Sequence, residues 1–134
     1  MTIVIDTNIV LALYDRGDED HRRAVSFYAD LDEDIFTTPM VAAEMDHLVR
    51  LRAGRAAAMR LWSDFDDGAI QLRWWSSALP EILAIARASP QLGLADASLL
   101  ALAPVVRSTR IATFDHEHFA AARTTDGEPF VLLP

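Results

Sequence analysis

Four acidic residues stand out because their neighbours along the chain are apolar. They are Asp6 and Asp115, each at the end of a strand-like run, and Glu44 and Asp96, each inside an apolar stretch. Acidic side chains are seldom buried unless they are paired or bind a metal. Most of the other acids lie in polar stretches and are typical of solvated faces, turns and helix starts. These four are therefore the candidates for chemistry.

Four carboxylates that meet at one place repel one another, and a hard divalent cation relieves that repulsion. Mg²⁺ or Mn²⁺ bound by such oxygens can generate a hydroxide nucleophile and stabilise charge on a phosphate. The acids therefore indicate metal-dependent chemistry on a phosphate ester, provided that the fold brings them together.

Each acid also has a structural interpretation that needs no site. Asp6 could cap the helix that follows it, and Asp96 could cap a helix after the Gly93 turn. Asp115 could be a turn residue, and Glu44 could be a lone acid on a helix face. Each acid alone is a weak indication of an active site, and the four together are a much stronger one.

Short β-branched and apolar runs alternate with segments of helical periodicity, which predicts an α/β fold with a parallel sheet covered on both faces. Thr38, Pro39 and Gly54 mark the start and end of one helix. Pro104 is expected to kink or end another. The expected strands are 2–5, 35–37, 69–73, 110–113 and 130–132. The expected helices are 8–14, 18–31, 39–53, 55–65, 79–88 and 94–102.

This arrangement predicts where the acids lie. Ligands of open parallel sheets bind outside the carboxyl ends of the strands, where Asp6 and Asp115 both stand. Glu44 and Asp96 lie on predicted helices that can point at the same edge. We therefore expect one acidic pocket there.

Composition limits the alternatives. The 134 residues are 51% hydrophobic, which suits one buried core and one domain spanning residues 1–134. The sequence has no membrane-length apolar run and no cysteine. We expect a cytoplasmic protein that has no signal peptide and does not bind membranes. All 12 basic residues are arginine, which excludes lysine-dependent mechanisms. The net charge of −8 means that nucleic acid would need local arginines or a metal.

The ordered set of motifs resembles the PIN-domain family, most closely its VapC-type toxin ribonucleases. The resemblance spans nearly the whole chain and rests on Val4-Ile5-Asp6-Thr7-Asn8, Glu44, Gly93-Leu94-Ala95-Asp96-Ala97, and Ala112-Thr113-Phe114-Asp115 with Phe119. It implies a PIN-like three-layer fold with a central, mostly parallel sheet of four to five strands flanked by helices.

The resemblance also implies roles for these residues. Asp6, Glu44, Asp96 and Asp115 would be the catalytic acids of a metal-dependent endoribonuclease, the toxin of a type II toxin–antitoxin module. Asp6, Asp96 and Asp115 would bind Mg²⁺, with Mn²⁺ as the alternative, and Asn8 and Thr113 would orient the acids through hydrogen bonds. The implied partners are an RNA substrate, a cognate VapB-like antitoxin and a second copy of the chain in a homodimer.

Three other sets of residues have less specific interpretations. The four histidines lack a shared metal-ligand spacing, and for His116 and His118 surface or RNA contact is favoured over ligation. The three tryptophans favour packing over stacking on bases. The arginines at 50, 52, 55 and 60 either hold phosphates or solvate helix faces, and the sequence leaves both open.

Two rival functions have acids at strand ends or share the fold. A receiver domain needs a lysine that the chain lacks, and a dehalogenase-type phosphatase needs an aspartate where Asn8 stands. The other rival is a non-catalytic PIN-like module that binds RNA or protein, and such a module need not retain all four acids.

Overall fold

The computed structural model describes all 134 residues, and its strands form one five-stranded sheet in the order β3-β2-β1-β4-β5. Every neighbouring pair is parallel, which confirms the predicted parallel sheet. β1 lies at the centre, and its apolar residues Ile3, Val4 and Ile5 are fully buried. The strands are β1 (Thr2–Ile5), β2 (Asp34–Thr37), β3 (Gln71–Leu72), β4 (Arg110–Ala112) and β5 (Val131–Leu133).

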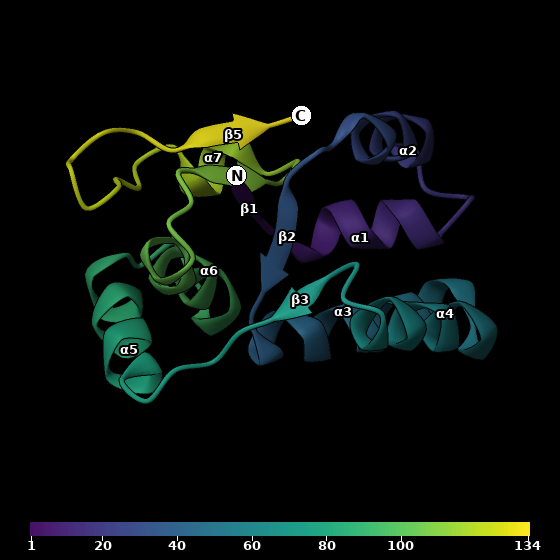
Figure 1. Cartoon of the computed structure of the whole chain (residues 1–134), viewed down its shortest axis with the longest axis horizontal. Coiled ribbons are helices and arrows are strands. Elements are labelled where there is room, and N and C mark those ends of the chain that lie inside the picture. The colour runs from purple at the N-terminus through teal and green to yellow at the C-terminus, as the bar shows by residue number, and fades with distance from the viewer.

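Seven helices flank the sheet. In Figure 1, α5 and α6 lie on one side of the strands, whereas α1, α2 and α4 lie on the other. This is the three-layer arrangement that the alternating pattern predicted. The helices are α1 (Thr7–Tyr14), α2 (His21–Asp30), α3 (Pro39–Ala53), α4 (Arg55–Asp66), α5 (Ala78–Ala88), α6 (Leu94–Val105) and α7 (His116–Phe119).

Helix α3 has the predicted boundaries because its ends carry the expected caps. The Thr38 hydroxyl accepts a hydrogen bond from the Val41 N–H at 3.2 Å, and Pro39 occupies the first turn. Gly54 then ends the helix with a φ of 89°, a backbone conformation that favours glycine. These caps fix where α3, which carries Glu44, begins and ends.

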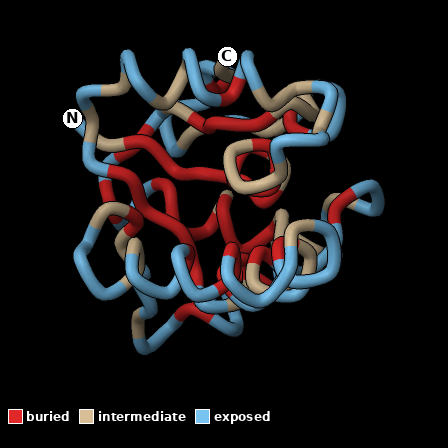
Figure 2. Tube along the Cα trace, turned by 90° about the vertical axis from the view of Figure 1, so that its right-hand side faces the viewer, coloured by how far each residue is buried: buried red, intermediate tan, exposed pale blue.

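A core of 22 buried residues joins the sheet to the helices on both sides. Figure 2 shows the buried chain running through the middle of the molecule, with exposed residues on the outer turns of the helices. A smaller cluster, Ala78, Ile82, Ala97 and Ala101, packs α5 against α6. The core thus holds β1, β4 and the helices next to them as a rigid frame.

No helix has the length and apolarity needed to cross a membrane.

The sixth predicted helix, 94–102, is three residues longer in the structure, and it ends one residue after Pro104, which was expected to kink or end it. Helix α6 includes Pro104 and ends at Val105. Pro104 has no N–H to donate to the Leu100 carbonyl, so the helix loses one backbone hydrogen bond just before its end. The N–H of Val106 bonds to the carbonyl of Leu102, and the N–H of Arg107 bonds to that of Pro104, both at 3.2 Å.

Other boundaries moved for local reasons. The predicted strand 69–73 is only Gln71–Leu72, because the Ile70 N–H bonds back to the Asp64 carbonyl of α4 at 3.3 Å. The second helix begins at His21 rather than residue 18, because the Asp18 carboxylate accepts the Asp20 N–H at 2.8 Å and forms a turn. The short helix α7 was not predicted.

Candidate active site

Asp6 stands where β1 ends and α1 begins, and its carboxylate is largely buried. One carboxylate oxygen accepts the N–H of Thr7 at 2.7 Å, so Asp6 does cap α1. The other oxygen accepts the Thr113 hydroxyl at 2.8 Å. The capping interpretation and the site interpretation therefore describe the same side chain.

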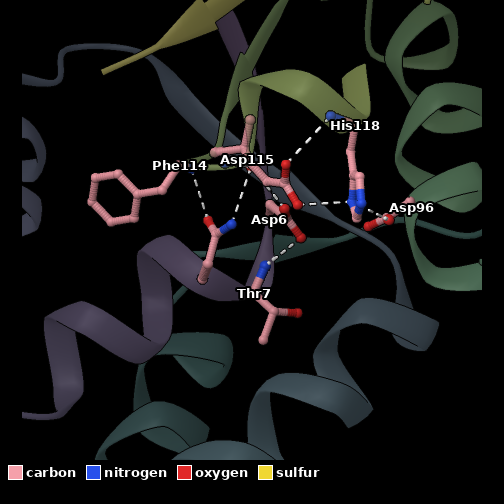
Figure 3. A network of polar contacts seen from close by, with 8 residues as sticks. Asp6, Thr7, Asp96, Phe114, Asp115 and His118 are labelled. Carbon is pink, nitrogen blue, oxygen red and sulfur yellow. Dashed lines mark hydrogen bonds and ion pairs between the residues drawn. The ribbon is translucent and has the colours of Figure 1, made fainter. Parts of the chain in front are cut away.

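A hydrogen-bonded network then joins α1 to the loop after β4 (Figure 3). Asn8 donates its side-chain N–H to the Thr113 hydroxyl at 3.2 Å, and it accepts the Phe114 N–H at 3.0 Å. The Asp115 N–H donates to the same Thr113 hydroxyl at 3.0 Å. Thr113 thus touches Asp6 directly and fixes the backbone of Asp115, while Asn8 acts through Thr113. Both positions suit the orienting role expected from the sequence.

Asp115 and Asp96 face each other across a histidine. The His118 Nδ1 lies 2.8 Å from an Asp115 carboxylate oxygen and 3.7 Å from one of Asp96 (Figure 3). Asp115 also caps α7, since its other oxygen accepts the His118 N–H at 3.3 Å. Asp96 lies in the first turn of α6.

His118 is exposed beside the site, which agrees with a surface position, and no finding tests contact with RNA. What the sequence did not predict is that its ring lies against two of the four acids. Its position three residues after Asp115 could have indicated this contact. A carboxylate that caps a helix lies next to the third residue of that helix, which in α7 is His118.

Glu44 projects from α3 toward the same place, and it forms no hydrogen bond or ion pair within the chain. The four acids line one hollow of about 370 Å³ at the carboxyl ends of β1 and β4. Asp6 and Asp115 come from strand ends, and Glu44 and Asp96 come from helices, as the sequence predicted. The other residues that line it are Thr7, Asn8, Leu11, Asp18, Asp20, Leu48, Arg52, Phe114 and His118.

The electrostatics of the hollow are unfavourable for so many carboxylates. Burial raises the pKa of Asp6 to about 6, and the charges of Asp96 and Glu44 add to the rise, although hydrogen bonds from Thr113 and Thr7 oppose it. Burial also raises the pKa of Asp96, with further contributions from Glu44 and Asp115, while His118 opposes the rise. The hollow therefore favours any cation that can enter it.

The donor chemistry of the hollow fits a hard divalent cation. Its carboxylates offer oxygen ligands, which Mg²⁺ and Mn²⁺ prefer. The hydroxyl of Thr7, which also lines the hollow, is buried without any hydrogen-bond partner in the chain. As the side chains stand, however, no three acidic or histidine groups are arranged to hold one ion.

A larger hollow lies next to this one. It measures about 1090 Å³ and is lined by residues of α1, α2 and α4, among them Leu13, Tyr28 and Arg60. None of the four acids lines it. Chemistry rather than size therefore selects the smaller hollow as the candidate active site.

Comparison with known proteins places the chain among proteins of one family. Residues 3–124 match the family model described as PIN domain. The chain is 35% identical to the ribonuclease VapC26 of Mycobacterium tuberculosis over 138 aligned positions, which cover 98% of this chain and all of that protein.

Solved structures share the fold. The crystal structure of Mycobacterium tuberculosis VapC20, named as a toxin that cleaves the sarcin–ricin loop, superposes with a TM-score of 0.77 at 19% identity, covering 90% of this chain and 95% of that one. FitAcB from Neisseria gonorrhoeae gives 0.65 at 20% identity, with 98% and 96% covered. VapBC2 from Rickettsia felis, bound to a DNA fragment from its promoter, gives 0.65 at 14% identity, with 100% and 98% covered.

Proposed function

This chain belongs to the PIN-domain family, and from that premise we propose that it is a metal-dependent endoribonuclease, the toxin of a type II toxin–antitoxin module. We treat residues 1–134 as its single domain. The ribonuclease VapC26 supports the activity, because it resembles this chain over nearly the full length of both proteins. The observation that carries the proposal is the hollow itself, in which Asp6, Glu44, Asp96 and Asp115 come together from four separate elements.

In the proposed reaction Asp6, Asp96 and Asp115 would hold Mg²⁺, or Mn²⁺ in its place. Such an ion would lower the pKa of a bound water and offset negative charge on the phosphate. The protein's part is to hold the carboxylates in place. Thr113 does so through its bonds to Asp6 and to the Asp115 N–H, and Asn8 keeps Thr113 oriented. Glu44 adds a carboxylate that faces the hollow without a partner in the chain.

Cleavage of RNA by the purified chain tests the proposal. We expect products with Mg²⁺ or Mn²⁺ and none after chelation by EDTA. Asp96→Asn keeps the shape of the side chain and removes one ligand charge, so it should abolish cleavage in a folded protein. Asp32→Asn is the matched control, because Asp32 is exposed and does not line the hollow. Cleavage by Asp96→Asn at the wild-type rate would refute the site.

A non-catalytic binding module is the second candidate, and one observation favours it. His118 lies between Asp96 and Asp115, and no three groups are arranged to hold an ion as they stand. Such a module would bind RNA or protein and leave RNA intact with every metal tested. The cleavage assay therefore separates the two candidates.

We also propose two protein partners. The first is a VapB-like antitoxin, which the family implies and which would lie along the larger hollow beside the acids. The segment Asp15–His21 and the end of α3 border both hollows. The second is another copy of the chain. Large apolar side chains remain exposed, including Leu51 at 70% and Leu79 at 49%, and a homodimer would cover part of this surface. Light scattering that gave a monomer at micromolar concentration would contradict the dimer.

A further inference from the structure

Arg52 is the only arginine or lysine side chain that lines the acidic hollow. Six of the lining residues are acidic, and the whole chain carries a net charge of −8. An RNA strand that enters therefore meets strong repulsion, and a metal ion can neutralise only the phosphate beside it. The flanking phosphates need a fixed cation from the protein.

Helix geometry directs Arg52 toward the acids. Glu44, Leu48 and Arg52 follow one another at intervals of four residues along α3, so they share one face of the helix. All three line the hollow. Side chains of a helix lean toward its N-terminal end, which turns Arg52 back toward Leu48 and Glu44. The Cα atoms of Glu44 and Arg52 are about 12 Å apart along the axis, so Arg52 occupies the rim.

Arg52 is also free to bind an anion. It is exposed, and no carboxylate lies within ion-pair distance, although six acids line the same hollow. Five other arginines of the chain already have partners. Arg23, which approaches this side through the ring of Phe114 at 4.9 Å, lies 4.0 Å from Asp20. The other engaged arginines are Arg110 with Glu33, Arg55 with Trp62, Arg73 with Phe36, and Arg123 with backbone carbonyls.

We propose that Arg52 binds an RNA phosphate that flanks the cleaved one, and so positions the strand across the acidic hollow. This inference rests on the proposed function, since it assumes that RNA is the substrate of that hollow. A planar guanidinium suits a phosphate because it can donate two parallel hydrogen bonds. Of the two interpretations that the sequence left open for the arginines at 50, 52, 55 and 60, phosphate binding thus applies to Arg52.

The competing explanation is that Arg52 merely places positive charge at the C-terminal end of α3, where cations are favourable. Arg50 gives a matched control for it. Arg50 lies in the same last turn, is also exposed and without an ion pair, and does not line the hollow. Removal of either arginine subtracts the same charge from the same helix end.

The test compares the wild type with Arg52→Ala, Arg52→Lys and Arg50→Ala in two assays. The first measures initial rates of cleavage over a range of RNA and NaCl concentrations. The second measures binding of a labelled single-stranded RNA by fluorescence anisotropy in Ca²⁺ buffer, with the RNA checked for integrity afterwards. Thermal melting checks that each variant is folded.

For Arg52→Ala we expect KM and Kd to rise about tenfold, with kcat within about twofold of the wild type. The slope of log Kd against log salt should become shallower by about 0.7, the value for one contact to a single strand. Arg52→Lys should have KM and Kd values between those of the wild type and Arg52→Ala, because an ammonium binds phosphate as a point charge only. Arg50→Ala should match the wild type.

Three outcomes separate the inference from the proposed function. If the wild type cleaves RNA and Arg52→Ala matches Arg50→Ala in KM, Kd and salt slope, the inference about Arg52 is wrong and the function stands. If RNA binds with the predicted dependence on Arg52 but is never cleaved, the phosphate contact of Arg52 stands and the proposed function fails. If RNA is neither bound nor cleaved, both are overturned.

Discussion

Asp6 caps a helix and lines the candidate active site with one carboxylate. Its two oxygens accept bonds from the Thr7 N–H and the Thr113 hydroxyl, yet burial still raises its pKa to about 6. Two hydrogen bonds therefore do not make up for the water that the group has lost. A carboxylate in that condition is stabilised by a proton or by a cation, as a metal ligand would be.

The raised pKa of Asp6 predicts how the metal-free protein responds to pH. The folded state holds the proton more tightly than the unfolded chain, whose carboxyl has the ordinary value of 3.8. The free energy of unfolding should therefore fall as the pH rises from about 4 to about 6, and stay lower above that. The contribution of Asp6 is at most about 3 kcal/mol.

Thermal or urea unfolding in EDTA from pH 4 to 7 measures this, with Asp6→Asn for comparison. The decline should be smaller in Asp6→Asn, because its side chain does not titrate. Equal pH dependence in both proteins would show that Asp6 titrates normally.

For individual residues, the sequence could predict which acids line the hollow but not how they contact their neighbours. Asp6, Glu44, Asp96 and Asp115 were found because apolar neighbours made them conspicuous, and all four line the hollow. The position of His118 depended on α7, a four-residue helix too short to leave a periodic pattern. The sequence could not distinguish Arg52 from the other arginines, because this depends on which face of α3 lies toward the acids.

Among the elements, the joint between α1 and the loop after β4 holds the site together. β1 and β4 are neighbouring parallel strands, so their carboxyl ends open at one edge of the sheet. Thr113 closes that edge with bonds to Asp6, Asn8 and the Asp115 N–H. Strand periodicity predicted β1 and β4 well. The predicted β3 was too long, because its first residues form a turn that bonds back to α4.

Removal of the Thr113 hydroxyl tests this joint. Thr113→Val should lower the free energy of unfolding by about 1–3 kcal/mol, because two donors lose their acceptor in a buried place. Cleavage should fall by about 10–100-fold, the range for residues that orient metal ligands. Thr113→Ser, which keeps the hydroxyl, should restore most of it.

Thr37→Val is the matched control for the joint. Thr37 is equally buried at the end of β2, and its hydroxyl donates to the Ile5 carbonyl at 3.2 Å without touching an acid. It should lose stability and keep its activity. Loss of activity in proportion to stability in both variants would assign Thr113 a purely structural role.

The whole molecule combines an acidic hollow with a larger, partly apolar hollow beside it. This pairing suggests how an antitoxin inhibits the proposed toxin. An extended or helical segment would occupy the larger hollow, and an arginine from the antitoxin would enter the acidic one and displace the metal. Affinity would come mainly from apolar contacts, and inhibition from the arginine.

Substitution of that antitoxin arginine by alanine tests the scheme once the partner has been identified. At equal and saturating occupancy the substituted antitoxin should still bind, while RNA cleavage returns. If cleavage stays fully inhibited, the acidic hollow is not blocked by an arginine. The sequence could predict the need for an inhibitor only through the family resemblance, since no residue of this chain specifies its partner.

We propose that the four carboxylates bind a divalent metal and that RNA cleavage depends on this binding. The most direct test measures Mn²⁺ bound to the wild type and to Asp96→Asn by electron paramagnetic resonance, in the same samples that are assayed for cleavage. We predict that the rate of cleavage rises in proportion to the Mn²⁺ bound by the wild type, and that Asp96→Asn loses both together. Cleavage at full rate with no bound metal, or bound metal unchanged in Asp96→Asn, would contradict the account.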